Sequence, residues 1–206
     1  MLKFDEALLK KRLSQTEPKR RVLFTAITST RVLPAYNIFK DKTNRGNPFE
    51  ASKAIDFIWE SFYAPSDRRQ WSNEVNLLIN NLMGMIPRED ESWIPLCDQA
   101  DDALSAVIYS LRCLLNPLPQ EAAWAVRRVY ETVDNVIINQ IEGTTIGERK
   151  EEAILSHRMM QQELKQEAED IKTAETTSFE QQNLREIRLL SQQNGLIFFQ
   201  RLLNAA

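Results

Sequence analysis

The stretch CDQADDALSAVIYSLRCLL, residues 97–115, opens with three aspartates that could do chemistry. Asp98 and Asp102 are four residues apart, so on a helix their carboxylates are neighbours on one face. Two such carboxylates, joined by Glu131 and Asp134 of the next helical stretch, could bind Mg²⁺ or Mn²⁺, which prefer oxygen ligands. One hypothesis is therefore a carboxylate-based, metal-dependent protein or enzyme.

Two other interpretations of the same stretch stay open. At about 100° per residue, the polar side chains fall on one strip about 100° wide, and the opposite side of the helix is apolar or small. A helix packed in a bundle can leave such a strip in water, and its dipole favours carboxylates near its start. The strip can also be an acidic surface that binds a partner. Its members are Asp98, Asp101, Asp102, Ser105, Tyr109 and Arg112.

Many chemistries have no support in the sequence. No GxxxxGK[ST], GxGxxG, CxxC or HExxH motif occurs, so neither a standard nucleotide loop nor a zinc site is expected. The single histidine, His157, lies in a polar stretch and is not expected to be catalytic.

Cys97 and Cys113 are expected to be buried free thiols. No signal peptide and no apolar run of membrane-spanning length is recognisable, which favours a cytoplasmic protein.

The charge is distributed unevenly along the chain. The net charge is -3, yet residues 1–22 hold seven basic and three acidic side chains, a local balance of +4. The chain as a whole therefore lacks the basic surface of a nucleic-acid-binding protein. We expect the basic end to be a solvated helix and loop, and we do not expect nucleic acid as a partner.

Apolar residues recur at helical spacing almost everywhere, and no alternating strand pattern is found. We predict an all-α fold of one domain, with eight or nine helices around an antiparallel hairpin of residues 95–142. Residues 18–146 form its core and residues 147–206 its polar C-terminal helices. A helix is expected over 148–174 and another over 179–194, which Gly195 can end. The segment LIFF, residues 196–199, is expected to fold back on the core; if exposed, it marks an interface.

Four stretches together resemble the bacterial YjaG-like family, domain of unknown function 416: RVLPAYNIF (31–39), AIDFIWESF (54–62), DDALSAVIYSLRCLL (101–115) and AAWAVRRVYETVDNVI (122–137). The resemblance covers residues 18–140, and the last third departs from the family's usual ending. Asp56, Trp59 and Glu60 match a D-x-x-W-E segment. Asp102 with Ala103 matches the aspartate that opens a helix, although Asp98 can be aligned there instead. The resemblance implies an all-helical, single-domain, cytoplasmic protein and carries over no activity or catalytic residue.

The absence of catalytic motifs and the acidic balance favour a non-enzymatic protein-binding module. It would act through the acidic strip and the long C-terminal helices. A toxin-neutralising immunity protein or a regulatory protein is one concrete version, because acidic proteins can mask basic sites. A homodimer is a further hypothesis, with LIFFQRLL pairing between chains. No cofactor is expected unless the aspartates hold Mg²⁺ or Mn²⁺.

Overall fold

The computed structural model describes residues 1–63, 68–87, 96–141 and 148–205. Its elements in these residues are α-helices, which confirms the predicted all-α fold. They number ten, or nine when α2 and α3, which meet at Leu33, are taken as one. In chain order they are α1 Glu6–Ser14, α2 Pro18–Val32, α3 Pro34–Thr43, α4 Pro48–Glu60, α5 Arg68–Met83, α6 Cys97–Leu115, α7 Pro119–Ile141, α8 Glu148–Ser156, α9 Arg158–Thr176 and α10 Gln181–Ala205.

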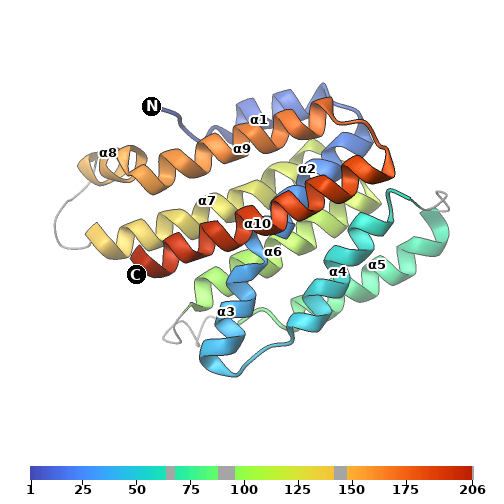
Figure 1. The fold of residues 1–206 in the computed structure, drawn as a ribbon, viewed down its shortest axis with the longest axis horizontal. Coiled ribbons are helices and arrows are strands. Elements are labelled where there is room, and N and C mark those ends of the chain that lie inside the picture. The colour runs from blue at the N-terminus through green and yellow to red at the C-terminus, as the bar shows by residue number, and fades with distance from the viewer. Residues whose placement is uncertain (64–67, 88–95, 142–147, 206) are drawn as a thin grey trace.

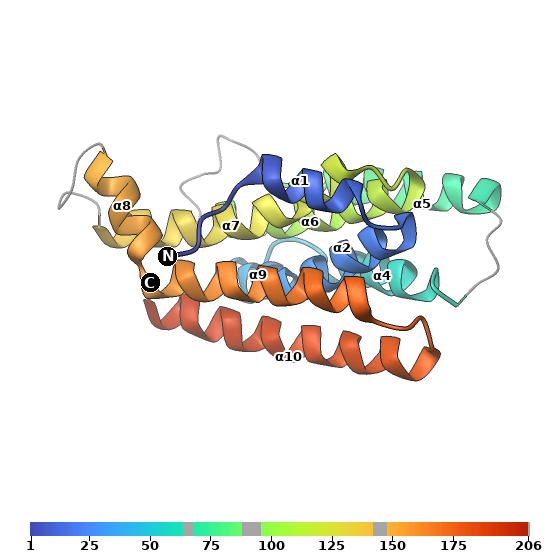
Figure 2. The ribbon, with the colours of Figure 1, turned by 90° about the horizontal axis from the view of Figure 1, so that it is seen from above.

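Helix α2 is the element around which the others are arranged. It packs against α6 and α7 on one side and against α9 and α10 on the other, so that α10 forms an outer layer (Figures 1 and 2). Every residue from Val22 to Val32 is buried. The helix contains threonines, but Thr25 and Thr28 donate their hydroxyls to carbonyls of the preceding turn, at 2.9 Å each. Their polar groups are therefore satisfied without water.

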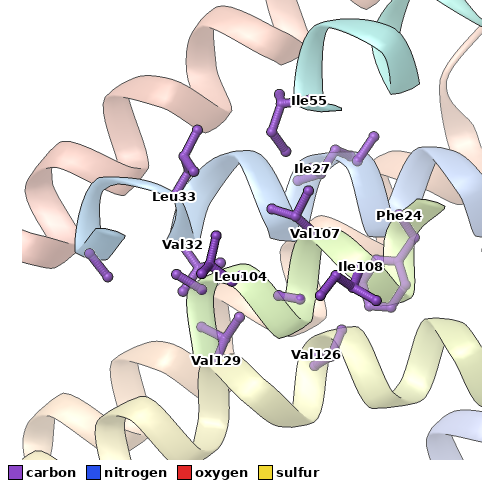
Figure 3. Packing of buried hydrophobic residues seen from close by; sticks show 14 of the residues in the cluster. Phe24, Ile27, Val32, Leu33, Ile55, Leu104, Val107, Ile108, Val126 and Val129 are labelled. Carbon is purple, nitrogen blue, oxygen red and sulfur yellow. The ribbon is translucent and has the colours of Figure 1, made fainter. Parts of the chain in front are cut away.

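The predicted helical hairpin is formed by α6 and α7, which pack along each other's length. Figure 3 shows apolar side chains of α6 between α2 and α7. Leu104 and Val107 are fully buried, as is Val129 of α7. The hairpin is one wall of the core around α2. The same cluster of buried side chains includes Met160, Leu164 and Ile171 of α9, so the polar C-terminal helices contribute apolar stripes to it.

Proline fixes the start of four helices. Pro18, Pro34, Pro48 and Pro119 are the first residues of α2, α3, α4 and α7. Proline suits this position because its φ is already helical and its missing N–H has no helical partner there. The break predicted at Pro34 is confirmed, and it turns the chain from α2 into α3.

The prediction of one helix over 148–174 is wrong, because the helix is interrupted at His157, between α8 and α9. Residue His157 has extended backbone angles and its Nδ1 accepts a hydrogen bond from the backbone N–H of Met159 at 3.3 Å. The side chain thus satisfies a free N–H at the start of α9. The single histidine of the chain has this capping role in the structure.

The prediction that Gly195 ends a helix is also wrong, since α10 continues through it to Ala205. A Cβ atom at Gly195 would lie 2.5 Å from the backbone carbonyl oxygen of Arg31. Glycine is therefore required for close packing of α10 on α2, rather than for a left-handed turn. Among the described helices, none combines the length and the apolar character that a membrane crossing requires.

We expect Gly195→Ala to destabilise the protein by about 1–3 kcal/mol, because the added methyl group must push two helix backbones apart. The intrinsic helix preference of alanine, worth about 1 kcal/mol, acts in the opposite direction and is outweighed. Urea denaturation measures the difference. The matched control is Gly84→Ala, where an added Cβ meets atoms at 3.5 Å or more. Equal stability of the two variants would contradict this account of Gly195.

Candidate functional site

The polar strip predicted on α6 exists, but much of it is covered by α7. Asp102 and Ser105 are buried, Asp101 and Tyr109 are half-buried, and Asp98 is exposed in the first turn. The Ser105 hydroxyl donates to Asp101 at 2.8 Å. The polar strip is therefore more deeply buried than expected for a strip left in water. Of its three aspartates, Asp98 is exposed, Asp101 is half-buried and Asp102 is buried.

Asp102 is bound by two residues of α7. Its Oδ2 accepts a hydrogen bond from the Thr132 hydroxyl at 3.0 Å, and its Oδ1 lies 3.4 Å from Nη1 of Arg128. The same Arg128 nitrogen lies 3.1 Å from Oε2 of Glu131, whose other oxygen accepts from Arg127 at 2.8 Å. Arg128 thus lies between the carboxylates of Asp102 and Glu131, at the position where the metal-site hypothesis would place the ion.

The structure brings only part of the predicted metal set together. Asp102 and Glu131 meet at Arg128, whereas Asp98 is exposed and Asp134 is half-buried beside Tyr130. Within the described ranges, no group of three or more His, Cys, Asp or Glu side chains is arranged to hold a metal ion. The arrangement favours an internal ion-pair network that fastens α6 to α7.

The far end of the strip is an aromatic and arginine cluster. The ring of Tyr109 lies 5.4 Å from that of Trp124 on α7, and the Arg112 guanidinium lies 5.5 Å from the centre of the Tyr109 ring. Arg112 also donates to Oε1 of the buried Glu121 at 2.8 Å. These contacts join α6 and α7 once more, and they leave Arg112 partly exposed.

Burial raises the pKa of Asp102 to about 7, although the Thr132 hydroxyl and the charge of Arg128 act to lower it. The carboxyl group therefore changes charge near neutral pH. Its neighbours are fixed hydrogen-bond and ion-pair partners, so the group contributes a pH-dependent contact between two helices.

The sequence analysis missed a second, more deeply buried polar cluster, which joins α2 to α9. Arg31 is only 1% exposed. Its Nη1 and Nη2 both donate to the carboxylate of Glu163 at 2.7 Å, and its Nε donates to Asp170 at 3.1 Å. The second oxygen of Asp170 accepts from Gln166 at 2.8 Å. This bidentate binding of the Glu163 carboxylate uses the planar guanidinium group of arginine, which lysine cannot reproduce.

The electrostatics of this cluster keep Arg31 charged. Burial acts to lower the pKa of its guanidinium, but the charges of Glu163 and Asp170 outweigh burial and raise that pKa. Burial, helped by the charge of Glu163, raises the pKa of Glu167 to about 8. Burial also raises the pKa of Asp170, against the opposing effect of Arg31. One buried guanidinium thus binds two carboxylates, and its charge also acts to lower the pKa of Glu167.

Helix α10 closes over this cluster. The Arg31 guanidinium lies 5.7 Å from the centre of the Phe198 ring, and a cavity of about 120 Å³ remains between α2, α9 and α10. The cavity is lined by Arg31, Met159, Gln162, Glu163, Gln166, Asn194, Ile197 and Phe198. The inner face of α10 thus packs against Arg31 at two points. Gly195 lies against the Arg31 backbone, and Phe198 lies over the Arg31 guanidinium.

The outer face of α10 is apolar and exposed. The segment LIFF divides between the two faces: Phe198 and Phe199 are buried, whereas Leu196 and Ile197 are not. The prediction that this segment folds back on the core is thus correct for two of its four residues. The large apolar side chains on the outer face, with their exposed fractions, are Leu189 (58%), Leu190 (54%), Leu196 (59%) and Ile197 (46%).

A seven-residue spacing signals this face in the sequence. Leu189 and Leu196 are seven apart, as are Leu190 and Ile197, and seven residues are close to two helical turns. We refer to these four residues and Gln193, which is also exposed, as the α10 face. An apolar face of this kind on a well-packed helix is typical of a contact surface.

The basic N-terminal residues are used within the molecule. Arg12 pairs with Glu175 of α9 at 2.6 Å, and Arg20 donates to the carbonyl of Ala174 at 2.9 Å. Arg21 donates to three backbone carbonyls. These contacts bring the end of α9 to the start of α2, and they account for part of the local positive charge.

A family model described as "Protein of unknown function (DUF416)" matches residues 8–197. The resemblance noted for residues 18–140 is thus confirmed, and the match extends through most of the polar last third. A DUF416 family protein from Shewanella baltica OS155, known from its crystal structure, has a similar fold with a TM-score of 0.75. The two chains are 18% identical, and the match covers 88% of this chain and 92% of that one. No curated protein matches the sequence.

The raised pKa of Asp102 predicts a specific pH dependence of stability. The folded state holds this proton up to about pH 7, whereas the unfolded state releases it near the ordinary aspartate pKa of 3.8. Between these values, Asp102 makes the free energy of unfolding fall as pH rises, by up to roughly 1.4 kcal/mol per unit. We expect Asp102→Asn to lose this part of the pH dependence in urea denaturation from pH 5 to 8.

Thr132→Val provides the second arm of this test. The Thr132 hydroxyl lowers the pKa of Asp102, so its removal raises that pKa further and extends the fall in stability to higher pH. Parallel stability curves for the wild type and Asp102→Asn would show that Asp102 does not titrate in this range.

Proposed function

We propose that this chain, which belongs to the DUF416 family of proteins of unknown function, is a non-enzymatic protein-binding module. Its binding surface is the α10 face, and the partner presents an apolar, uncharged helical surface of its own. The observation that carries the proposal is the exposure of four large apolar side chains on one side of an otherwise well-packed helix.

Burial of apolar area favours such binding. Removing apolar surface from water is worth about 25 cal/mol per Å², and leucine side chains at about half exposure have much of their surface left to bury. The four side chains form two adjacent pairs along α10, and only uncharged residues separate the pairs. A helix laid against them can bury all four at once, as in helix-in-groove recognition.

The rigidity of the platform supports the same function. The inner side of α10 is held by Gly195 against the Arg31 backbone and by Phe198 over the Arg31 guanidinium. A surface that is already ordered loses less conformational entropy when it binds. The outward direction of the α10 face is thus set before any partner arrives.

The acidic strip on α6 gives less support to a binding role. Asp102 is committed to Thr132 and Arg128, and Asp101 to Ser105, so Asp98 is the freely exposed carboxylate of that strip. An immunity or regulatory protein that masks a basic site would rely on that strip. We therefore place the partner on α10, and the immunity role is a narrower version of the proposal.

A photocrosslinking experiment in the native cells tests this function. We replace Gln193, at the centre of the α10 face, with p-benzoylphenylalanine and irradiate the cells. The expected result is a discrete adduct of this chain with one polypeptide. Leu190→Glu in the same chain should abolish the adduct, because it places a charge in the apolar contact.

The matched control carries the photocrosslinker at Asn73, an exposed position on α5. Helix α5 lies on the opposite side of the molecule from α10 (Figure 2). The same adduct from Asn73, or an adduct from Gln193 that survives Leu190→Glu, would refute the assignment of the binding surface to α10.

A further inference from the structure

We propose that the occupant of the α10 face is a second copy of this chain, with the two α10 helices antiparallel about a two-fold axis at Gln193. This inference rests on the proposed binding role of the α10 face and names its partner. The following geometry and charge distribution carry it.

The α10 face is self-complementary about Gln193. At about 100° per residue from Gln193, Leu189 and Leu190 lie near −40° and +60°, and Ile197 and Leu196 lie near +40° and −60°. A two-fold axis at Gln193 brings residues with the same sign of angle onto the same flank of the pair. Leu190 thus meets Ile197 of the second copy, and Leu189 meets Leu196, in each case within about one residue of equal height.

The distribution of charge fits a second copy better than an unrelated acidic or basic partner. A two-fold axis places a surface against itself, so any charge near the axis meets its own sign. Residues 189–200 contain no charged side chain, although 27% of the whole chain is charged. Gln193 on the axis carries both donors and an acceptor, so two copies of its amide can hydrogen-bond to each other.

Glu186, before the α10 face, favours the antiparallel orientation. Exposed Glu186 precedes the α10 face on the same side of the helix. A parallel pair would place Glu186 against Glu186 of the other copy, and like charges at that distance repel. The antiparallel pair places Glu186 opposite uncharged Gln200 instead. It also aligns the two helix dipoles in opposite directions, which is the favourable arrangement.

The position of α10 leaves room for this contact. It forms the outermost layer beyond α2 and α9, with its full length along one side of the molecule (Figure 2). The uncharged segment 189–200 is about 18 Å long at 1.5 Å per residue. A pair of helices in contact over this length is a small interface, so we expect a micromolar dissociation constant rather than a nanomolar one.

Single-cysteine variants of the purified full-length protein map the register of the pair. On the axis, Gln193→Cys should form a disulfide-linked dimer with its own copy under oxidised glutathione at about 100 μM protein, above a micromolar dissociation constant. Gln182→Cys should not, because antiparallel pairing separates its two copies by about 33 Å. Wild-type protein measures the background, since native Cys97 and Cys113 are both buried.

A mixture of two variants fixes the orientation. Glu186→Cys and Gln200→Cys should crosslink with each other when mixed, and neither should crosslink alone, because each alone is about 21 Å from its own copy. Leu190→Glu added to Gln193→Cys should abolish the crosslink while the chain stays folded, as its helical circular dichroism will show.

Two results would overturn the inference. One is a monomeric Gln193→Cys protein under these conditions, and the other is equal crosslinking of Gln193→Cys and Gln182→Cys. A monomer whose Gln193 photoadduct in cells contains a different polypeptide would leave the proposed binding function standing and refute the second copy as partner. Absence of both the disulfide and the photoadduct would refute the two proposals together.

Discussion

The burial of one arginine in the middle of the bundle is the constraint on which the rest of this structure depends. Arg31 lies on the central helix, where a lone charge would be strongly unfavourable, and Glu163 and Asp170 of α9 supply the compensating charge. Because the guanidinium fork fits one carboxylate with two hydrogen bonds, it fixes both the rotation and the height of α9 on α2. The buried polar residues of α9, Glu163 and Asp170, are explained by this requirement.

The same residue determines how α10 is presented. The Arg31 backbone carbonyl approaches Gly195, and its guanidinium lies under Phe198, so α10 has one permitted face toward the core. The leucines of the α10 face must then point outward, since the inner positions are already filled, and Ile197 lies at the edge of this face beside the cavity. The direction of this apolar surface is thus a consequence of how the core is closed, and the partner that we propose for it would complete the burial that the single chain leaves unfinished. The ion-pair network around Asp102 and Arg128 has a different role. It joins α6 to α7, which pack against α2 on the side opposite α9 and α10.

Much of the fold could be predicted from local signals, because prolines, helical periodicity and short connections act within a few residues of the chain. The starts of α2, α3, α4 and α7 at prolines and the α6–α7 hairpin are of this kind. Features that depend on distant contacts could not be predicted in the same way. Gly195 looks like a helix stop until the backbone of Arg31 lies beside it, and His157 gives no sign of capping a helix. In the sequence, the carboxylates of α9 resemble those of a solvated helix face. Their partner Arg31 lies some 130 residues earlier in the chain, so no local pattern shows that the two helices meet. Of the candidate site, the sequence indicated the polar strip on α6 and the apolar segment LIFF, but not which of their side chains the fold would cover.

The stability of an Arg31→Met variant tests most directly whether the Arg31 cluster holds α9 and α10 in place. Methionine fills much of the volume but leaves Glu163 and Asp170 buried without a positive partner, so urea denaturation at pH 7 should show a loss of about 3–5 kcal/mol. The comparison is Arg12→Met, which breaks an ion pair whose arginine side chain is 44% exposed and should cost at most about 1 kcal/mol. Native-state hydrogen exchange should show the Arg31→Met loss first in the amides of α9 and α10. A loss no larger than that of Arg12→Met, with α9 and α10 still protected, would contradict the account.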